Sequence, residues 1–201
     1  MAVRAAATSA RREAILEAAL RLFTKKGFAD TSIDDLRQAS GASVGSIYHH
    51  FGGKAGVAAA LYAETLRDYQ QGVLDLIRER PGARQGIEGI VHHHLAWIAH
   101  HPDEARYLFG TRAAEVLLAS RKELRAMNRT FFKEIFGWLA EQGEAGRIRK
   151  VRRNLYFPLV IGPSQELARQ WLDGLVEEPL EDAADVLAEA AWNALKTGGR
   201  R

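Results

Sequence analysis

Apolar residues recur at helical spacing along almost all of the 201-residue chain, and this periodicity constrains the fold more than any other feature. Near the N-terminus they form a single stripe at helical spacing, made of Ile15, Ala18, Ala19, Leu22 and Phe23. Sustained period-two alternation, the mark of half-buried β-strands, does not occur in the sequence. The sequence therefore predicts an all-α protein of about nine helices.

Glycines and capping residues divide this helical pattern near the N-terminus. Gly27 is expected to cap the end of the first helix. Two overlapping capping boxes then predict the start of a short second helix, Thr31 with Asp34 and Ser32 with Asp35. That helix should end near residue 39.

The rest of the chain is divided by glycines and prolines in the same way. Ser43 is a natural N-cap for a third helix over residues 44–50, and Lys54 opens a long fourth helix to about residue 80. Pro158 and the Gly162-Pro163 pair should kink or break a later helix. Five helices are expected after the Pro81-Gly82 break: to residue 100, from residue 102, and over about 121–142, 154–177 and 180–196.

The segment from Thr31 to Phe51 is a helix, a four-residue turn with Gly41 and a second short helix, which is the helix-turn-helix pattern. Six apolar side chains should hold these helices together and against the first: Ile33, Leu36, Ala39, Val44, Ile47 and Phe51. Small or hydrogen-bonding residues are left facing outward: Ser43, Gly45, Ser46, Tyr48 and His49. Such a face lets the backbone approach DNA and lets polar groups reach base edges or phosphates. An ordinary helical hairpin is the alternative.

Positive charge is concentrated near the N-terminus. The first 54 residues carry eight Lys and Arg residues against five acidic residues, a net charge of +3, while the remaining residues balance. A basic segment on a neutral body is what a module facing DNA phosphates would show. Charge alone agrees equally well with an ordinary solvated surface.

The residues of this segment also resemble a known family. Arg12 to Phe28, Thr31-Ser32-Ile33, and Ser46 to Phe51 with Lys54 are similar to the DNA-binding domain of tetracycline-repressor (TetR) regulators. The resemblance implies that six residues contact DNA, with Tyr48 and Lys54 on phosphates and Gly45 against the groove: Thr31, Ser43, Ser46, Tyr48, His49 and Lys54. Ser32 and Val44 complete the candidates for DNA binding. Ala55-Gly56-Val57 after Lys54 and Gly52-Gly53 before it depart from the family pattern, which bears on the stiffness of this joint.

The resemblance further implies a ligand-responsive homodimer that binds a palindromic double-stranded DNA operator. The expected domains are a DNA-binding domain over residues 1–53 and an effector-binding and dimerisation domain over residues 54–201. A repressor released by a small apolar or aromatic effector is the expected function. An activator of the same fold and a helical small-molecule carrier that never binds DNA are the alternatives.

Two groups of residues are candidates for sensing and assembly. The middle of the chain is rich in aromatic residues, and family analogy places an effector pocket there, with candidates His94, Trp97, Ile98, Phe109, Phe131 and Ile135. The alternative is that these residues only form the core. The last two predicted helices carry more apolar surface than a terminal hairpin needs, so a four-helix bundle with a second copy is expected through Leu167, Trp171, Leu175, Leu187, Ala191 and Leu195.

Several other functions are disfavoured. Residues 41–45 match the G-x-S-x-G pattern of serine hydrolases, but that motif needs a preceding strand, and these residues follow a capped helix. Histidines at 92–94 and 100–101 suggest a metal site, but H-E-x-x-H is absent, so exposed or cavity-wall histidines are expected. The basic run over residues 147–153 favours a solvated loop over a second nucleic-acid patch. We therefore expect no catalytic residue, no metal and no cofactor.

The cellular compartment is inferred from what the sequence lacks. It contains no cysteine, no apolar run of the length of a membrane span and no segment with the pattern of a signal peptide. A protein without cysteine has no use for an oxidising compartment, so a cytoplasmic location is expected.

Overall fold

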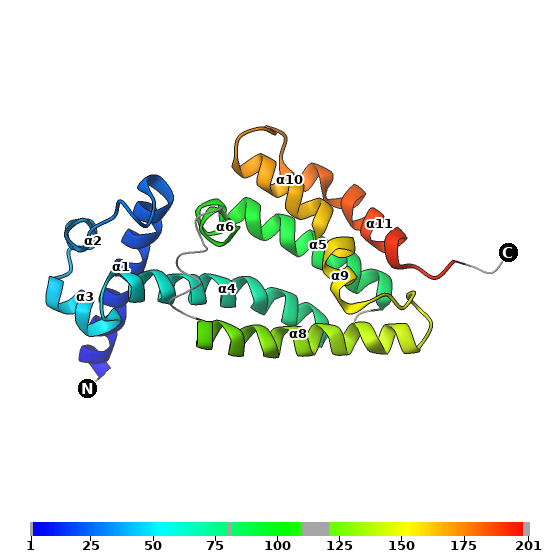
Figure 1. The fold of residues 1–201 in the computed structure, drawn as a ribbon, viewed down its shortest axis with the longest axis horizontal. Helices are drawn as coiled ribbons and strands as arrows, with labels where there is room; N and C mark the ends of the chain where they lie inside the picture. The colour runs from blue at the N-terminus through cyan, green and yellow to red at the C-terminus, as the bar shows by residue number, and fades with distance from the viewer. Residues whose placement is uncertain (1, 80–81, 110–120, 199–201) are drawn as a thin grey trace. The chain divides into compact units, whose positions relative to one another are not determined.

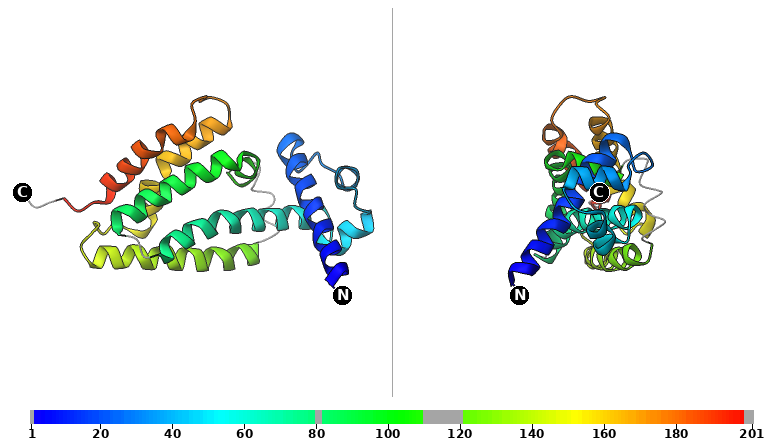
Figure 2. Two further views of the ribbon diagram at one scale, coloured as in Figure 1. Left: turned by 180° about the vertical axis from the view of Figure 1, so that it is seen from behind. Right: turned by 90° about the vertical axis from the view of Figure 1, so that its left-hand side faces the viewer.

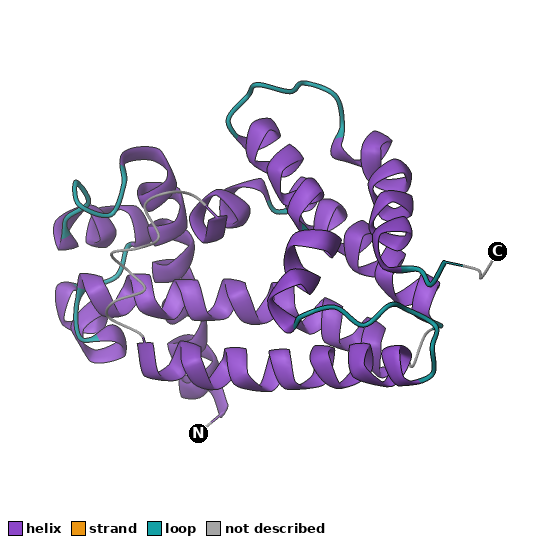
Figure 3. Ribbon diagram, turned by 45° about the vertical axis from the view of Figure 1, so that its right-hand side comes forward, coloured by secondary structure: helices purple, strands orange, loops and turns teal. Residues whose placement is uncertain are grey.

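The computed structural model describes residues 2–79, 82–109 and 121–198, and Figure 1 shows them as a succession of helices. The described residues hold no strand beyond one isolated bridge, between Ile148 and Lys196 (Figure 3). The all-α prediction is confirmed. The elements are α1 (Ala2–Lys26), α2 (Ile33–Ser40), α3 (Val44–Phe51), α4 (Lys54–Arg78), α5 (Ala83–His100), α6 (Pro102–Phe109), α8 (Arg121–Glu144), α9 (Arg153–Val160), α10 (Gly162–Leu172), the 3-10 helix η1 (Leu180–Ala183) and α11 (Ala184–Leu195).

The predicted helix over 154–177 is two helices in the structure, α9 and α10, so the described residues hold ten α-helices where about nine were expected. The break falls at Ile161, and Pro163 lies in the first turn of α10, where its missing N–H leaves no hydrogen bond unmade. Pro158 lies inside α9 without ending it. The prediction was right that the Gly162-Pro163 pair breaks the helix. It placed the C-terminal end at about residue 177, whereas α10 ends at Leu172.

The chain divides into two compact units. The N-terminal unit comprises Met1–Leu66 with Asp103–Leu124, and the C-terminal unit comprises Arg67–Pro102 with Arg125–Arg201. Helix α4 contributes its first half to one unit and its second half to the other. The division therefore falls inside a helix, whereas the predicted DNA-binding domain ends at residue 53. The division into functional domains stays a prediction.

The core of the N-terminal unit locks α2 and α3 onto α1. Leu36 and Ile47, one from each short helix, are fully buried beside Ile15 of α1. Ala39 and Val44 were expected to join this core, but both are exposed because they lie on the outer sides of their helices. Other buried members of the cluster are Leu16, Ala19, Phe23, Ala42, Val57, Ala58, Leu61 and Tyr107.

Tyr107 ties α6 into this N-terminal core. Its hydroxyl donates a hydrogen bond of 2.8 Å to the carbonyl of Ala58, and its ring stacks on Phe23 with 6.1 Å between the ring centroids. Burial raises the pKa of the Tyr107 phenol far above its ordinary value, with a smaller contribution from Tyr62. Tyr107 comes from the aromatic-rich middle of the sequence, and the structure assigns it to the unit that holds the helix-turn-helix.

Helix α5 is the centre of the C-terminal unit, with α11 and α10 packed along it (Figures 1 and 2). Nearly every second or third residue of α5 is buried, including Ile87, Val91, Leu95 and Ile98. The segment before α9 is fixed to the end of α11, because the amide of Arg149 donates to the carbonyl of Leu195 at 2.8 Å. No helix among the described residues is both long and apolar enough to cross a membrane.

Polar contacts join the second half of α4 to α8, which lie side by side in Figures 1 and 2. Gln70 donates a hydrogen bond of 2.8 Å to Asn128, and the Arg78 guanidinium forms a two-pronged ion pair with Glu134 at 3.0 Å. Gln70 is nearly fully buried, so its amide contributes more than an exposed pair would.

The core assignment of α2 can be tested by truncating its buried leucine. Leu36→Ala should lower the free energy of unfolding by about 2 to 5 kcal/mol, because it leaves a cavity at a fully buried position. Val44→Ala is the matched control on α3, at a side chain that is 41% exposed, and should change the free energy by less than about 0.5 kcal/mol. Urea unfolding followed by circular dichroism measures both. Equal losses in the two variants would contradict the assignment.

Candidate nucleic-acid interface

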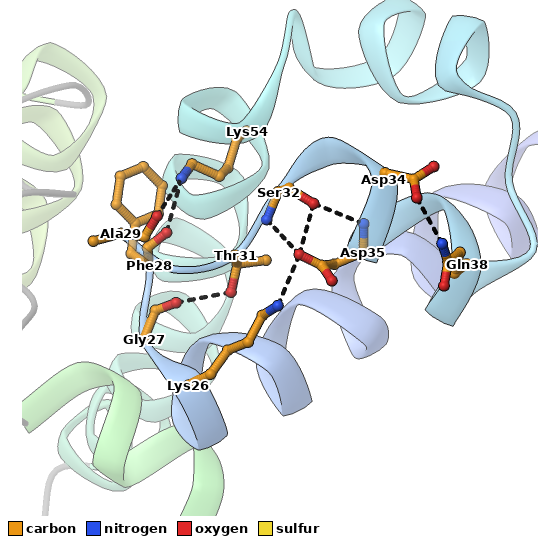
Figure 4. Close-up of polar contacts among 10 residues, drawn as sticks. All are labelled: Lys26, Gly27, Phe28, Ala29, Thr31, Ser32, Asp34, Asp35, Gln38 and Lys54. Atoms are coloured by element: carbon orange, nitrogen blue, oxygen red, sulfur yellow. Dashed lines mark hydrogen bonds and ion pairs between the residues drawn. The ribbon is translucent and has the colours of Figure 1, made fainter.

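The start of α2 is fixed by one capping box. The amide of Asp35 donates to the Ser32 hydroxyl at 3.1 Å, and the amide of Ser32 donates to the Asp35 carboxylate at 2.7 Å (Figure 4). This box was predicted and is confirmed. The second predicted box is wrong, because Thr31 donates its hydroxyl to the carbonyl of Gly27 at 2.7 Å, and Asp34 instead accepts from side chains of its own helix.

Thr31 and Lys54 are both engaged inside the protein (Figure 4). Thr31 is 1% exposed, so its side chain fastens the loop between α1 and α2 and does not reach solvent. The Lys54 ammonium donates to the carbonyls of Phe28 and Ala29, at 2.9 and 3.2 Å, and lies 4.5 Å from the centre of the Phe28 ring. In this conformation Lys54 clamps the same loop from the start of α4. Their predicted contacts with DNA stay predictions.

The turn and both ends of α3 are set by glycines and a serine. Gly41 ends α2 with φ = 66°, a conformation that glycine adopts without strain. The Ser43 hydroxyl then accepts a hydrogen bond of 3.1 Å from the amide of Ser46, which confirms Ser43 as the N-cap of α3. Gly52 closes the helix at φ = 73°, and its amide donates to the carbonyl of Tyr48 at 2.8 Å.

The outward face of α3 is assembled as predicted. Ile47 is fully buried, while Tyr48 on the other side is 53% exposed. Ser43, Val44, Gly45 and His49 are exposed as well, and Ser46 is half-buried. Ser32, at the start of α2, is also exposed. This face offers two hydroxyls, a phenol and an imidazole around a glycine, the set that close approach to a polynucleotide needs.

The joint between α3 and α4 is tight rather than loose. A Cβ on Gly56 would overlap the carbonyl of Phe51, so the glycine is what allows the first turn of α4 to approach the end of α3. Arg12 of α1 forms a two-pronged ion pair with Glu64 of α4, which raises the pKa of Arg12. The Arg12 guanidinium also lies 5.4 Å from the centre of the Phe51 ring. The departure from the family pattern at Gly56 thus has a steric reason.

Much of the positive charge counted in the sequence is paired within this unit. Lys26 forms an ion pair with Asp35 at 2.8 Å, and this contact, with the hydrogen bonds from Ser32, holds the pKa of Asp35 far below its ordinary value. Arg37 forms an ion pair of 2.7 Å with Asp34 and lowers the pKa of that carboxyl. Sequence reasoning missed both pairs: Asp34 and Arg37 lie three residues apart on one helix, a spacing that could have revealed them, whereas Lys26 and Asp35 come from different helices and no local pattern shows that they meet.

Comparison with known proteins agrees with this geometry. Residues 15–61 match the family model described as "Bacterial regulatory proteins, tetR family". The HTH-type transcriptional repressor KstR2 of Mycolicibacterium smegmatis is 30% identical over 132 residues, which cover 59% of this chain and 62% of that protein. The chain spans between 40% and 62% of the length of the first curated relatives that it matches.

Solved structures share the fold over nearly the full chain. A TetR family transcription regulator from Marinobacter aquaeolei has a TM-score of 0.78 at 22% identity and covers 98% of this chain and 99% of that one. The regulator FadR from Bacillus subtilis, solved in complex with stearoyl-CoA, has a TM-score of 0.78 at 17% identity and covers 90% and 98%. Residues 15–61 thus match the DNA-binding domain of the TetR family of bacterial regulatory proteins, and the chain shares the fold of a solved TetR family regulator. The family consists of regulators, as expected, and not of enzymes.

The effector candidates fall into both units. His94 and Ile98 of α5 are fully buried, and the Tyr69 hydroxyl of α4 lies 2.9 Å from Nδ1 of His94. Trp97 donates its indole N–H to Asp68 at 2.9 Å. On α8, Phe131 is buried and Ile135 is half-buried, while Phe109 belongs to the N-terminal unit. A common pocket for all six candidates stays a prediction.

The remaining histidines do not converge. His92 lies 2.9 Å from Asp185 of α11, His93 contacts the carbonyl of Tyr69 at 3.1 Å, and His100 contacts the carbonyl of Ala96 in its own helix. His101 stacks on Trp97 with 5.1 Å between the ring centroids. Within the described residues, no group of three or more His, Cys, Asp or Glu side chains is arranged to hold a metal ion.

The dimer candidates differ in how much surface they leave open. Leu175 is 72% exposed, and Leu167, Trp171 and Leu187 are half-buried. Leu195 is fully buried and Ala191 nearly so, because α11 packs this side against α5. These two residues already belong to the core of the protomer, and they have little area left for a second copy. The remaining four stay candidates.

The buried imidazole of His94 should make stability depend on pH. Burial, with a smaller contribution from His93, lowers the pKa of His94 to about 4. Between about pH 4 and about pH 6.5 the imidazole of the unfolded chain, with a pKa of about 6.5, is protonated, while the buried imidazole of the folded protein stays neutral. Stability is full above pH 6.5 and falls as the pH drops toward 4. Between pH 7 and pH 5 the free energy of unfolding should decrease by about 2 kcal/mol.

The pH effect is measured by urea unfolding at several pH values. His94→Gln should remove this share of the pH dependence. His100→Gln, at an exposed position on the same helix, is the matched control and should keep the wild-type dependence. If His94→Gln and the wild type lost the same free energy between pH 7 and pH 5, the neutral buried imidazole would be contradicted.

Proposed function

We propose that this TetR-family protein is a DNA-binding transcriptional regulator that reads a palindromic operator with α3. The observation that carries the proposal is the outward face of α3, where Ser43, Gly45, Tyr48 and His49 are exposed while Ile47 is fixed in the core. A helix docked so firmly on one side can enter a major groove with the other without rearranging. Side chains of this kind serve base edges and phosphates and have no role in the core.

Phosphate binding in this proposal relies on hydroxyl groups and on a few free cations. Lys26, Arg37 and Arg12 are paired with acids, and Lys54 is bound to backbone carbonyls. Tyr48 is exposed and well placed to donate its phenol to a phosphate, as the family resemblance suggests. Exposed cations of α1, such as Arg21, supply the charge that makes operator binding depend on salt.

The C-terminal unit is proposed to bind a small apolar effector beside α5. His94 and Tyr69 form a polar pair among buried apolar side chains. Such a pair can orient the polar end of a ligand in an otherwise apolar site. The similar regulator FadR was solved with stearoyl-CoA, a ligand with a long apolar chain. An apolar effector with a polar end is accordingly the class we propose for this protein.

We propose that effector binding releases the protein from DNA through the helices that connect the two units. Helix α4 runs from the N-terminal unit into the C-terminal unit, and α6 of the N-terminal unit follows directly after α5. A ligand that favours one arrangement of α4 and α5 therefore changes which spacing of two DNA-binding heads is populated. We propose that effector binding favours the spacing that cannot engage both half-sites, which makes the protein a repressor.

The proposed recognition face is tested by operator binding, measured by fluorescence anisotropy on DNA from the region flanking the gene. Tyr48→Phe removes one phosphate donor and should weaken binding by about 3- to 10-fold, the cost of one hydrogen bond. His49→Ala should weaken it as well, and the logarithm of affinity should fall linearly with the logarithm of salt concentration.

His100→Ala is the matched control, since it removes an exposed histidine of the C-terminal unit. It should bind DNA like the wild type. Wild-type affinity in both α3 variants, or an affinity that does not change between 50 and 200 mM salt, would refute DNA recognition by this face.

The proposed dimer is tested at the most exposed apolar residue of its candidate surface. Leu175→Glu should remain folded, because Leu175 is 72% exposed, and should sediment with the 22.3 kDa mass of one chain. Phe132→Glu on α8, at a side chain that is 38% exposed, is the control and should sediment with twice that mass. A wild-type chain that sediments as a monomer at all micromolar concentrations would contradict the proposal.

A further inference from the structure

A pocket in the C-terminal unit is lined by none of the six residues proposed for effector binding. It is formed by the end of α8, the segment that follows it and the start of α9, and its volume is about 300 Å³. This volume is at the lower end of the range of small-molecule sites. Its main lining side chains are the rings of Phe136 and Tyr156, the aliphatic Leu139 and Val151, and the cations of Lys150 and Arg153.

The aromatic part of the pocket holds one of these cations in place. The Arg153 guanidinium lies over the ring of Phe136, 4.1 Å from its centre. The rings of Phe136 and Tyr156 meet at an interplanar angle of 53°, with 6.3 Å between their centroids. A guanidinium stacked on an aromatic ring keeps its N–H edge free to donate in the plane. The site therefore presents an oriented donor next to flat apolar walls.

The second cation is positioned by a glycine. A Cβ on Gly143 would lie 3.3 Å from Cγ of Lys150, which is closer than ordinary packing, so the bare backbone of Gly143 leaves room for the Lys150 stem. Gly143 is itself buried, near the end of α8. The aliphatic part of Lys150 thus packs on the helix, and Lys150 is one of the residues that line the pocket.

The charge of the pocket is positive. Lys150 and Arg153 face only one acidic lining residue, Glu144, and among the described residues neither cation forms an ion pair. Helix α9 begins at Arg153 with no side-chain cap and no acidic residue in its first turn. Cations at the positive end of a helix dipole are destabilising unless an anion compensates them. This arrangement favours a bound anion.

We propose that this pocket is a second ligand site, which binds a small anion, a carboxylate or a phosphate ester, carried on a flat apolar body. The anion would accept hydrogen bonds from Arg153 and Lys150, and the apolar body would lie against Phe136, Leu139 and Tyr156. A solvated basic loop would account for the cations alone, but not for a cavity in which they line the same walls as two aromatic rings. The site does not depend on the proposed DNA binding.

The test uses 2-naphthoate as the probe, added to the full chain without DNA and followed by ¹⁵N–¹H NMR. The amides of Gly143, Lys150, Val151 and Tyr156 should shift in a saturable way. The neutral isostere 2-naphthylmethanol should bind more weakly. The double variant Lys150→Gln/Arg153→Gln should lower naphthoate affinity about tenfold, as expected for two partly solvated charge contacts, and should leave the affinity for the alcohol unchanged.

The matched control is Arg149→Gln/Arg152→Gln, which removes two exposed cations of the same segment that do not line the pocket. It should bind naphthoate like the wild type, and circular dichroism should show both double variants folded. An equal loss of affinity in the two variants would reduce the effect to general positive charge and overturn the proposal. Shifts centred on α5, or no saturable shift at all, would overturn it too.

Discussion

The burial of Ile47 is the contact on which the recognition surface depends. Helix α3 has eight residues, too few for a helix that is stable alone, so its conformation and its rotation about its axis come from tertiary packing. With Ile47 buried beside Leu36 and Ile15, the 100° turn per residue leaves Tyr48 and His49 on the outside. The same contact that stabilises the domain thereby chooses which side chains can meet DNA.

The polar contacts around this core hold the helices and the loop between α1 and α2 in place, and they leave fewer cations available to bind DNA. Lys26 and Asp35 link the end of α1 to the capping box of α2, and Lys54 fastens the intervening loop from α4. Each contact uses a cation that composition alone would credit to DNA binding. The number of cations in the segment is therefore a poor guide to the positive charge that phosphates would meet, because ion pairs within the domain neutralise some of these cations locally.

The C-terminal unit handles polar groups in two different ways. His94 is enclosed by α5 and its neighbours, and burial keeps it neutral by lowering its pKa. Lys150 and Arg153 instead are exposed and line a pocket, where Lys150 packs on Gly143 and Arg153 lies over the ring of Phe136. An enclosed neutral imidazole suits an apolar ligand with a polar end, and an open cationic pocket suits an anion. The two places therefore would not compete for the same molecule.

The sequence by itself determined the all-α class, most helix ends and the outward face of α3. These features rest on local physics: helical periodicity, the Ser32 and Ser43 caps, and glycines at the ends of helices. The tertiary structure alone decided that Tyr107 joins the N-terminal core and that Leu195 belongs to the protomer core. Only it brought Arg153 and Phe136 to one pocket. Such contacts join residues that are distant in the sequence. A local pattern predicts which side of a helix is apolar, but not which other element packs against that side.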